Sequence, residues 1–298
     1  VYVATSGVEN PQIGATTSGA LFGGCGAIMW GLGEVFARRR RLFLPAIAIV
    51  ISLTGFIVVA VALLYAGVLL GRGIDNVDMS AMPPELRVGI LIASAFAFIT
   101  PLAFYARFRL PFSLGLTGAG MAGFIVVLAL TTNFDLTVQY LAPLQLGLGV
   151  LLFLAGVAFD ARDPARTTRY SDNGFWLHFA AAPLILRGAF GLIDVEGSGN
   201  DASHAALTLG VVLLLGVVSL LINRRALIVS TLITTGVAIG ILMNAVGLGE
   251  GALAASTLIV LGAFVLILGA SWHVFRRALL GWVKPDGVWA RIFPPETQ

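Results

Sequence analysis

The sequence predicts an all-α protein, a polytopic transmembrane helix bundle of about nine spans. Hydrophobic residues make up 58% of the 298 residues and charged residues only 11%. That charged share is about half of what a soluble domain carries. Long apolar stretches also recur along the whole chain. Many of them reach the roughly 20 residues that a helix needs to cross a bilayer.

Nine stretches have the length and hydropathy of membrane spans. They cover residues 13–36, 42–70, 86–105, 112–132, 142–159, 175–193, 204–222, 226–246 and 252–272. The first is the weakest because it is rich in glycine and threonine. We expect one bundle at 13–272, preceded by a polar segment (1–12) and followed by a cytoplasmic interfacial tail (273–298). The chain starts at Val1 rather than at a methionine, which leaves open whether residues precede it.

The basic residues orient this bundle. Fifteen of the 18 lysines and arginines fall in gaps that nine spans would place on one face, beginning with the run Arg38–Arg41. Only Arg72 and Arg87 lie on the other face, and Arg187 lies within a span. Because positively charged loops stay in the cytoplasm, the distribution predicts an outer N-terminus and a cytoplasmic C-terminus. We therefore expect a multi-pass membrane protein, and the resemblance given below implies the inner (plasma) membrane.

Composition and motifs exclude several classes of function. Cys25 is the only cysteine, so neither an internal disulfide nor a thiolate metal cluster can form. His178, His204 and His273 lack ligand spacing, and we expect no metal and no cofactor. The chain has no phosphate-binding loop, no HExxH and no G-x-S-x-G motif. The sequence therefore predicts a non-enzymatic protein, and its basic excess reflects cytoplasmic arginines rather than nucleic-acid binding.

Glycine supplies the predicted means of helix packing. The chain has 36 glycines, with the spacings Gly19-x-x-x-Gly23 and Gly236-x-x-x-Gly240 inside spans. Apolar helices in lipid associate through close contact at small residues. We expect these faces to pack within the monomer, with self-association as the alternative.

Arg187 is the main candidate for a binding residue. It lies well inside the span 175–193, where an ionisable side chain is costly and indicates function by default. Its side chain leans toward the start of its helix, away from the nearer membrane surface. We expect a partner within the bundle, either a carboxylate (Glu85, Asp135, Asp194 or Glu250) or carbonyl groups. A structural ion pair and a role in binding or transport both remain open.

Three further residues are candidates. Trp176 shares a helix face with Pro183 and Arg187, whereas His178 faces elsewhere. His178 is expected near the cytoplasmic interface, as a structural residue or as a proton-handling one. Glu34 precedes Arg38 by four residues, the order that stabilises a helix end, and a proton-coupling carboxylate is the alternative.

The tail and two motifs indicate a bacterial inner membrane. Arg276, Arg277 and Lys284 alternate with apolar residues, which is typical of an anchor on the anionic lipids of the inner leaflet. The stretches EVFARRRRLFLP (34–45) and SDNGFWLHFAAAPLI (171–185) resemble those of an uncharacterised family of bacterial multi-spanning inner-membrane proteins. This resemblance implies a location in that membrane, and it brings no known activity.

Two functions follow. The first is a non-enzymatic scaffold or assembly partner whose polar residues serve packing. The second is a transporter or channel for a small solute, anionic if Arg187 contacts it, with His178 or Glu34 coupling protons. Transporters that couple protons usually carry a carboxylate within their spans, and the spans offer essentially only Arg187. The sequence therefore favours the scaffold narrowly.

Overall fold

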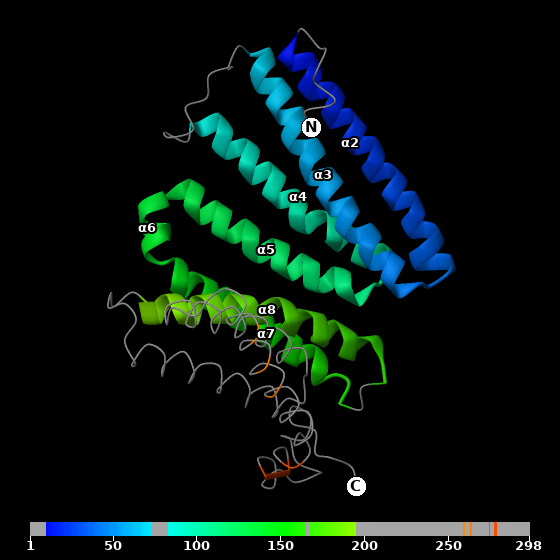
Figure 1. The fold of residues 1–298 in the computed structure, drawn as a ribbon, viewed down its shortest axis with the longest axis vertical. Coiled ribbons are helices and arrows are strands. Elements are labelled where there is room, and N and C mark those ends of the chain that lie inside the picture. Colours follow the sequence, from blue (N-terminus) through cyan, green and yellow to red (C-terminus); the bar gives the residue numbers. More distant parts are fainter. Residues whose placement is uncertain are drawn as a thin grey trace. The chain divides into compact units, whose positions relative to one another are not determined.

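The computed structural model describes residues 10–72, 83–164 and 167–194, with six isolated positions between 255 and 278. All regular elements in these ranges are helical (Figure 1). They are α2 (Pro11–Gly33), a π-helical segment η1 (Glu34–Arg39), α3 (Phe43–Gly71), α4 (Pro84–Phe108), α5 (Pro111–Thr132), α6 (Phe134–Gln139), α7 (Leu141–Asp160) and α8 (Arg169–Asp194).

Six helices in the described ranges are long and apolar enough to cross a membrane, which confirms the all-helical, membrane-embedded class. They correspond to the first six predicted spans. Even the weak first span is helical, and Asn10 caps it by accepting a hydrogen bond from the Gln12 amide at 3.0 Å. The predicted spans 204–222, 226–246 and 252–272 lie outside the described residues. So do the first nine residues and nearly all of the tail.

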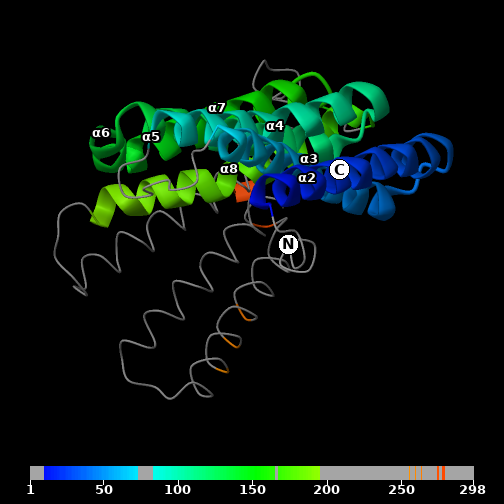
Figure 2. The same cartoon turned by 90° about the horizontal axis from the view of Figure 1, so that it is seen from above.

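The chain divides into two compact units, Val1–Tyr140 and Leu141–Gln298. In the first, α2 packs on α3, α3 on α4, and α4 on α5, so each helix lies beside the next in the chain (Figure 2). In the second, α7 and α8 pack along their lengths as an antiparallel pair. Short connections force this arrangement because consecutive helices have no room to separate.

Glycines set the distance between paired helices. A Cβ added to Gly19 would lie 2.8 Å from Leu64 Cγ, and one added to Gly26 would lie 2.7 Å from Ile57 Cδ1. Contacts this short fit only a hydrogen, so α2 and α3 approach more closely than larger residues allow. The prediction that Gly19 serves packing within the monomer is confirmed. Gly236 and Gly240 lie outside the described residues.

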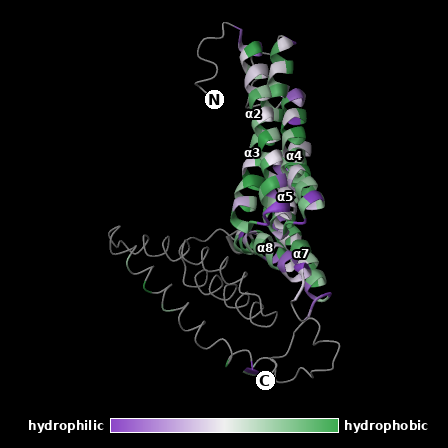
Figure 3. Ribbon diagram, turned by 90° about the vertical axis from the view of Figure 1, so that its right-hand side faces the viewer, coloured by the Kyte–Doolittle hydropathy of each residue, from purple (hydrophilic) through white to green (hydrophobic). Residues whose placement is uncertain are grey.

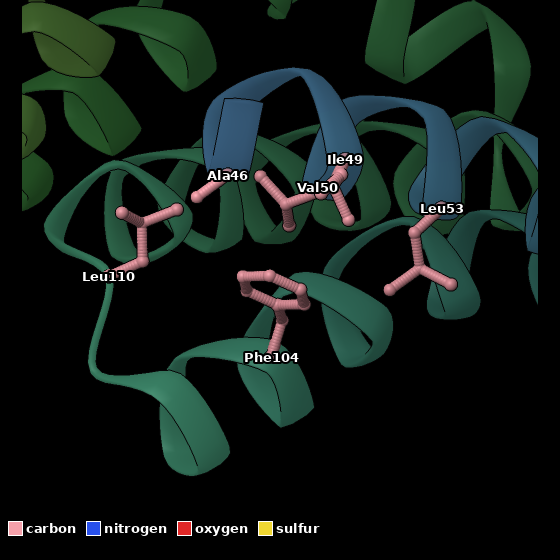
Figure 4. Packing of buried hydrophobic residues seen from close by; sticks show 6 residues of the cluster. All are labelled: Ala46, Ile49, Val50, Leu53, Phe104 and Leu110. Carbon is pink, nitrogen blue, oxygen red and sulfur yellow. The ribbon is translucent and has the colours of Figure 1, made fainter. Parts of the chain in front are cut away.

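The core of the first unit lies under the turns that join its helices. Phe104 of α4 is fully buried and points at Val50 of α3, between Ala46, Ile49 and Leu53 (Figure 4). Leu110, in the α4–α5 connection, closes the cluster. Large apolar side chains such as those of Leu21 and Ile28 are exposed on the outer surface, and the α2–α5 ribbons are largely hydrophobic in colour (Figure 3). An apolar exterior suits a lipid environment.

Two inter-helix turns of the first unit share one backbone geometry. Arg41 (φ 52°) and Arg109 (φ 53°) adopt the left-handed conformation, which ends the preceding helix. Leu42 and Leu110 follow in extended conformation and begin α3 and α5. The chain thus reverses direction within about two residues at each place.

Two elements differ from the prediction. Residues 133–141 lie between the predicted spans 112–132 and 142–159, where no helix was predicted. They contain α6, which begins at Phe134 because the Asn133 side chain accepts a hydrogen bond from the Leu136 amide at 3.0 Å and caps the helix. The helix α8 begins at Arg169, six residues before the predicted start at Phe175. The segment 160–173, which lies between the predicted spans 142–159 and 175–193, therefore contains the last residue of α7, a short turn and the first residues of α8.

Candidate functional site

His178 is buried at the contact between α7 and α8, with 0% of its surface exposed. The buried hydrophobic residues of α8 are Leu177, Ala181, Ala182 and Leu186. Arg187 is exposed on a different face of the same helix. The prediction that His178 and Arg187 face different ways is confirmed, and the histidine faces α7.

The partner of His178 is Asp160, the last residue of α7. His178 Nε2 lies 3.1 Å from Asp160 Oδ2, and Asp160 is only 6% exposed. An ionised carboxylate only accepts hydrogen bonds, so Nε2 carries the proton of this contact when Asp160 is charged. The arrangement fixes the tautomer of the neutral imidazole and leaves its other nitrogen, Nδ1, without a hydrogen.

Two glycines make room for this pair. A Cβ on Gly156 of α7 would lie 2.8–3.0 Å from three ring atoms of His178, so the imidazole lies flat over the space that this glycine leaves. A Cβ on Gly174 of α8 would collide with Asp160 Oδ1. Phe153 covers the ring from one side, with centroids 4.9 Å apart. The site is thus built from both helices and admits no larger residue at either glycine.

The second ring nitrogen of His178 is buried without a described partner. Nδ1 makes no hydrogen bond with the residues that the structure describes. Asp160, in contrast, has a further interaction besides the one with His178. The other charged side chains described at this end of the hairpin are those of Arg162, Asp163, Arg169 and Asp172. A proton on Nδ1 would create a buried donor that needs an acceptor.

The α7–α8 turn is held by a second carboxylate. Asp163 accepts hydrogen bonds from the Thr168 hydroxyl at 2.7 Å, from the Thr168 amide at 2.8 Å and from the Thr167 amide at 3.2 Å. These bonds, above all the one from the Thr168 hydroxyl, hold the pKa of Asp163 below its ordinary value. The Asp163 carboxylate therefore stabilises the turn, and it holds the start of α8 in register with the end of α7.

We expect the order of this turn to depend on pH. Because the pKa of Asp163 is lower in the folded chain, its stabilising contribution is complete above about pH 4, its ordinary range, and is lost as pH falls through the lowered folded pKa. Hydrogen exchange of the Thr167 and Thr168 amides, corrected for the intrinsic effect of pH, measures this. Asp163→Ala should exchange fast at every pH. Protection that is unchanged in that variant would contradict the assignment.

The other candidate residues of this unit do not join the His178–Asp160 pair. Arg187 makes no hydrogen bond or ion pair with the side chains that the structure describes, which in α8 end at Leu192. Its predicted partner within the bundle stays a prediction, since the side chains of Asp194 and Glu250 lie outside that set. Trp176 packs edge-on against Phe175 and Phe179, with centroids 5.1 and 5.6 Å away. It acts here as part of an aromatic cluster.

Glu34 belongs to the first unit. Its predicted pair with Arg38 is confirmed at 3.2 Å, and Arg107 of α4 adds a second ion pair at 2.8 Å. The π-helical segment η1 presents Glu34 to both arginines. The residue therefore ties α4 to the end of α2, and both its carboxylate oxygens are engaged in ion pairs.

Asp160 is the site residue that the sequence interpretation missed, because it directly follows the predicted span 142–159. A signal was present. Close contacts between α7 and α8, such as Gly149 with Ile185 and Gly156 with His178, lie symmetrically about Thr167. The midpoint of the polar segment 160–173 marks the same place. If the two helices are paired about that midpoint, His178 lies opposite Gly156. Asp160 follows Gly156 by four residues, which is about one helical turn.

Comparison of the chain with protein-family models, with curated proteins and with solved structures finds no match. Within the described residues, no group of three or more histidine, cysteine or acidic side chains is placed to hold a metal ion. The chemistry of the site therefore has to be argued from His178, Asp160 and their surroundings.

Proposed function

We propose that this chain is a non-enzymatic, multi-pass protein of the bacterial inner membrane that carries a small solute in exchange or together with protons. The buried His178–Asp160 pair carries this proposal. The scaffold function was favoured from sequence because no carboxylate accompanied the ionisable residues of the spans. Asp160 supplies one, at hydrogen-bond distance from the single side chain type that changes charge between pH 5 and 8.

The proposed topology has nine spans, an outer N-terminus and a cytoplasmic C-terminus. The distribution of the basic residues supports it, and so does the resemblance of residues 34–45 and 171–185 to bacterial inner-membrane proteins. In this topology the α7–α8 turn lies at the cytoplasmic surface. The His178–Asp160 pair then lies within about two helical turns of that surface, within reach of cytoplasmic protons.

The pair gives a physical basis for coupling. A proton that reaches Nδ1 adds a positive charge to the buried site, and its N–H then needs an acceptor. A conformation that offers one, from another span, a solute or water, is stabilised only in the protonated protein. Proton binding thereby shifts the population between two conformations, as coupled transport requires. Arg187, exposed on another face of α8, is the proposed contact for an anionic solute.

A pH jump tests the proton step. The full-length protein is reconstituted in liposomes on a solid-supported membrane, and the external pH is stepped from 8 to 6. Wild type is expected to give a transient displacement of charge, which His178→Gln/Asp160→Asn should abolish. Asp172→Asn is the matched control, because that carboxylate is exposed in the first turn of α8 and lies outside the pair. Equal currents in wild type and in the double variant would refute the proposal.

The solute is tested with two probe anions, acetate and inorganic phosphate. A carrier that accepts either one gives a sustained current when the anion gradient is added to the pH step. We expect Arg187→Ala to weaken that current while the transient proton displacement persists. The two effects separate binding of the solute from binding of the proton.

The second candidate function is a scaffold or assembly partner. The close glycine-mediated packing of α2 on α3 and of α7 on α8 favours it, since a scaffold can pack as a solid bundle. In that case the His178–Asp160 pair joins α7 to α8 without taking up protons. Absence of any charge displacement in the folded wild type would support this function.

A further inference from the structure

Six arginines gather at one end of the first unit. Arg38–Arg41 occupy the connection between α2 and α3, and Arg107 and Arg109 lie at the end of α4. All six are exposed. The ion pair between Arg107 Nε and Glu34 Oε1, 2.8 Å long, joins the two places directly. The two turns, which share the left-handed arginine geometry of Arg41 and Arg109, therefore form one basic surface, which we call the arginine end.

The charge of the arginine end is almost uncompensated. Glu34 is the only acidic residue that the described part of the first unit places there, and it pairs with Arg38 and Arg107. Six arginines and one glutamate leave a formal excess of five positive charges. The side chains of Arg39, Arg40, Arg41 and Arg109 make no hydrogen bond or ion pair with the described residues. Their guanidinium donors are open to an anion.

Apolar side chains border these arginines. Leu42, Phe43 and Leu44 follow the run directly and are 43%, 46% and 76% exposed. The core around Phe104 lies immediately beneath and fixes both turns. Guanidinium groups above exposed leucine and phenylalanine match a lipid molecule, whose phosphate meets the charges and whose acyl chains meet the apolar side chains. A free phosphate ion would use only the first of these two features.

We propose that the arginine end binds the phosphate headgroups of anionic phospholipids. Guanidinium groups hold phosphate oxygens through two parallel hydrogen bonds, and the paired turns present several guanidinium groups to one headgroup region. This proposal uses none of the tail residues Arg276, Arg277 and Lys284. It is also independent of the His178–Asp160 pair, so either proposal can fail without the other.

Native mass spectrometry of the detergent-solubilised, full-length protein tests this. The protein is titrated with phosphatidylglycerol and with phosphatidylcholine of the same acyl chains. We expect phosphatidylglycerol to bind preferentially. Each arginine removed should weaken its binding about fivefold, the effect of one basic side chain at an anionic surface. Arg40→Gln/Arg109→Gln should therefore lose most of the preference.

Arg72→Gln is the matched control. Arg72 is equally exposed and lies at the opposite end of α3 from Arg40, so its removal lowers the net charge without touching the arginine end. Circular dichroism verifies that the variants are folded. The proposal is overturned if Arg40→Gln/Arg109→Gln keeps the wild-type preference, or if Arg72→Gln lowers it per charge by as much. It is also overturned if inorganic phosphate displaces phosphatidylglycerol at equal concentration, which would mark a site for phosphate ions.

Discussion

We expect His178→Leu to destabilise the contact between α7 and α8 by about 1.5–3 kcal/mol, the net contribution of a hydrogen bond to a charged group. The substitution keeps a side chain of similar size against Gly156, so little of the loss comes from a cavity. It takes from the buried Asp160 the imidazole that lies 3.1 Å away. The free energy of unfolding is measured by titrating the detergent-solubilised protein with sodium dodecyl sulfate.

The double variant His178→Leu/Asp160→Leu separates the charge from the packing. Replacing a buried pair by apolar residues is often neutral, because both desolvation costs disappear together. We therefore expect the double variant to lose less stability than His178→Leu and Asp160→Leu lose together. If the two substitutions simply add, the contact between His178 and Asp160 contributes nothing to stability. The electrostatic account of the site would then be wrong.

The second large effect is expected at Gly188, where α8 passes closest to the backbone of α7. A Cβ there would lie 2.7 Å from the Leu146 Cα and would also collide with the Leu146 amide nitrogen. A backbone cannot yield as a flexible side chain can, so Gly188→Ala forces the helices apart. We expect a loss of about 1–3 kcal/mol, the usual cost of overpacking, in the same titration.

Gly147→Ala is the control for that substitution. Gly147 lies on α7 one residue from Leu146, and a Cβ there would meet nothing within 4 Å. Since alanine has the higher helix propensity, this variant should be as stable as wild type or more stable by up to about 1 kcal/mol. A similar loss in both variants would show that the helices do not meet at Gly188 as described.

The fold class was predictable because the bilayer imposes one length and one hydropathy on every span. The first six stretches, including the glycine-rich residues 13–36, are helices, and only the sixth begins well before its predicted start. The pair of Glu34 with Arg38 was predictable because it follows from helical spacing alone. Its second partner, Arg107, was not, because 73 residues separate the two and only the packing of α4 brings them together.

The candidate site was only half predictable. His178 could be identified as an ionisable residue near the end of a span. Asp160 could not, because it lies where the hydropathy of the sequence falls at the end of a span. A charged residue at the end of an apolar stretch is normally assigned to a loop. Asp160 is nevertheless buried, because the residue opposite it on α8 is a glycine, Gly174. The failure is physical, because burial of a carboxylate depends on the small size of a residue on another helix. Hydropathy along one segment carries no information about that neighbour.

The glycine contacts of α2 with α3 and of α7 with α8 have a consequence for how such a chain can change in evolution. In both hairpins the contacting residues lie symmetrically about the turn. The residues that determine how the two helices pack therefore lie within the hairpin itself. Two helices that enter a membrane and return leave the following segment on the side where they started. A hairpin can therefore be duplicated, lost or exchanged as a module, and every later helix keeps its direction.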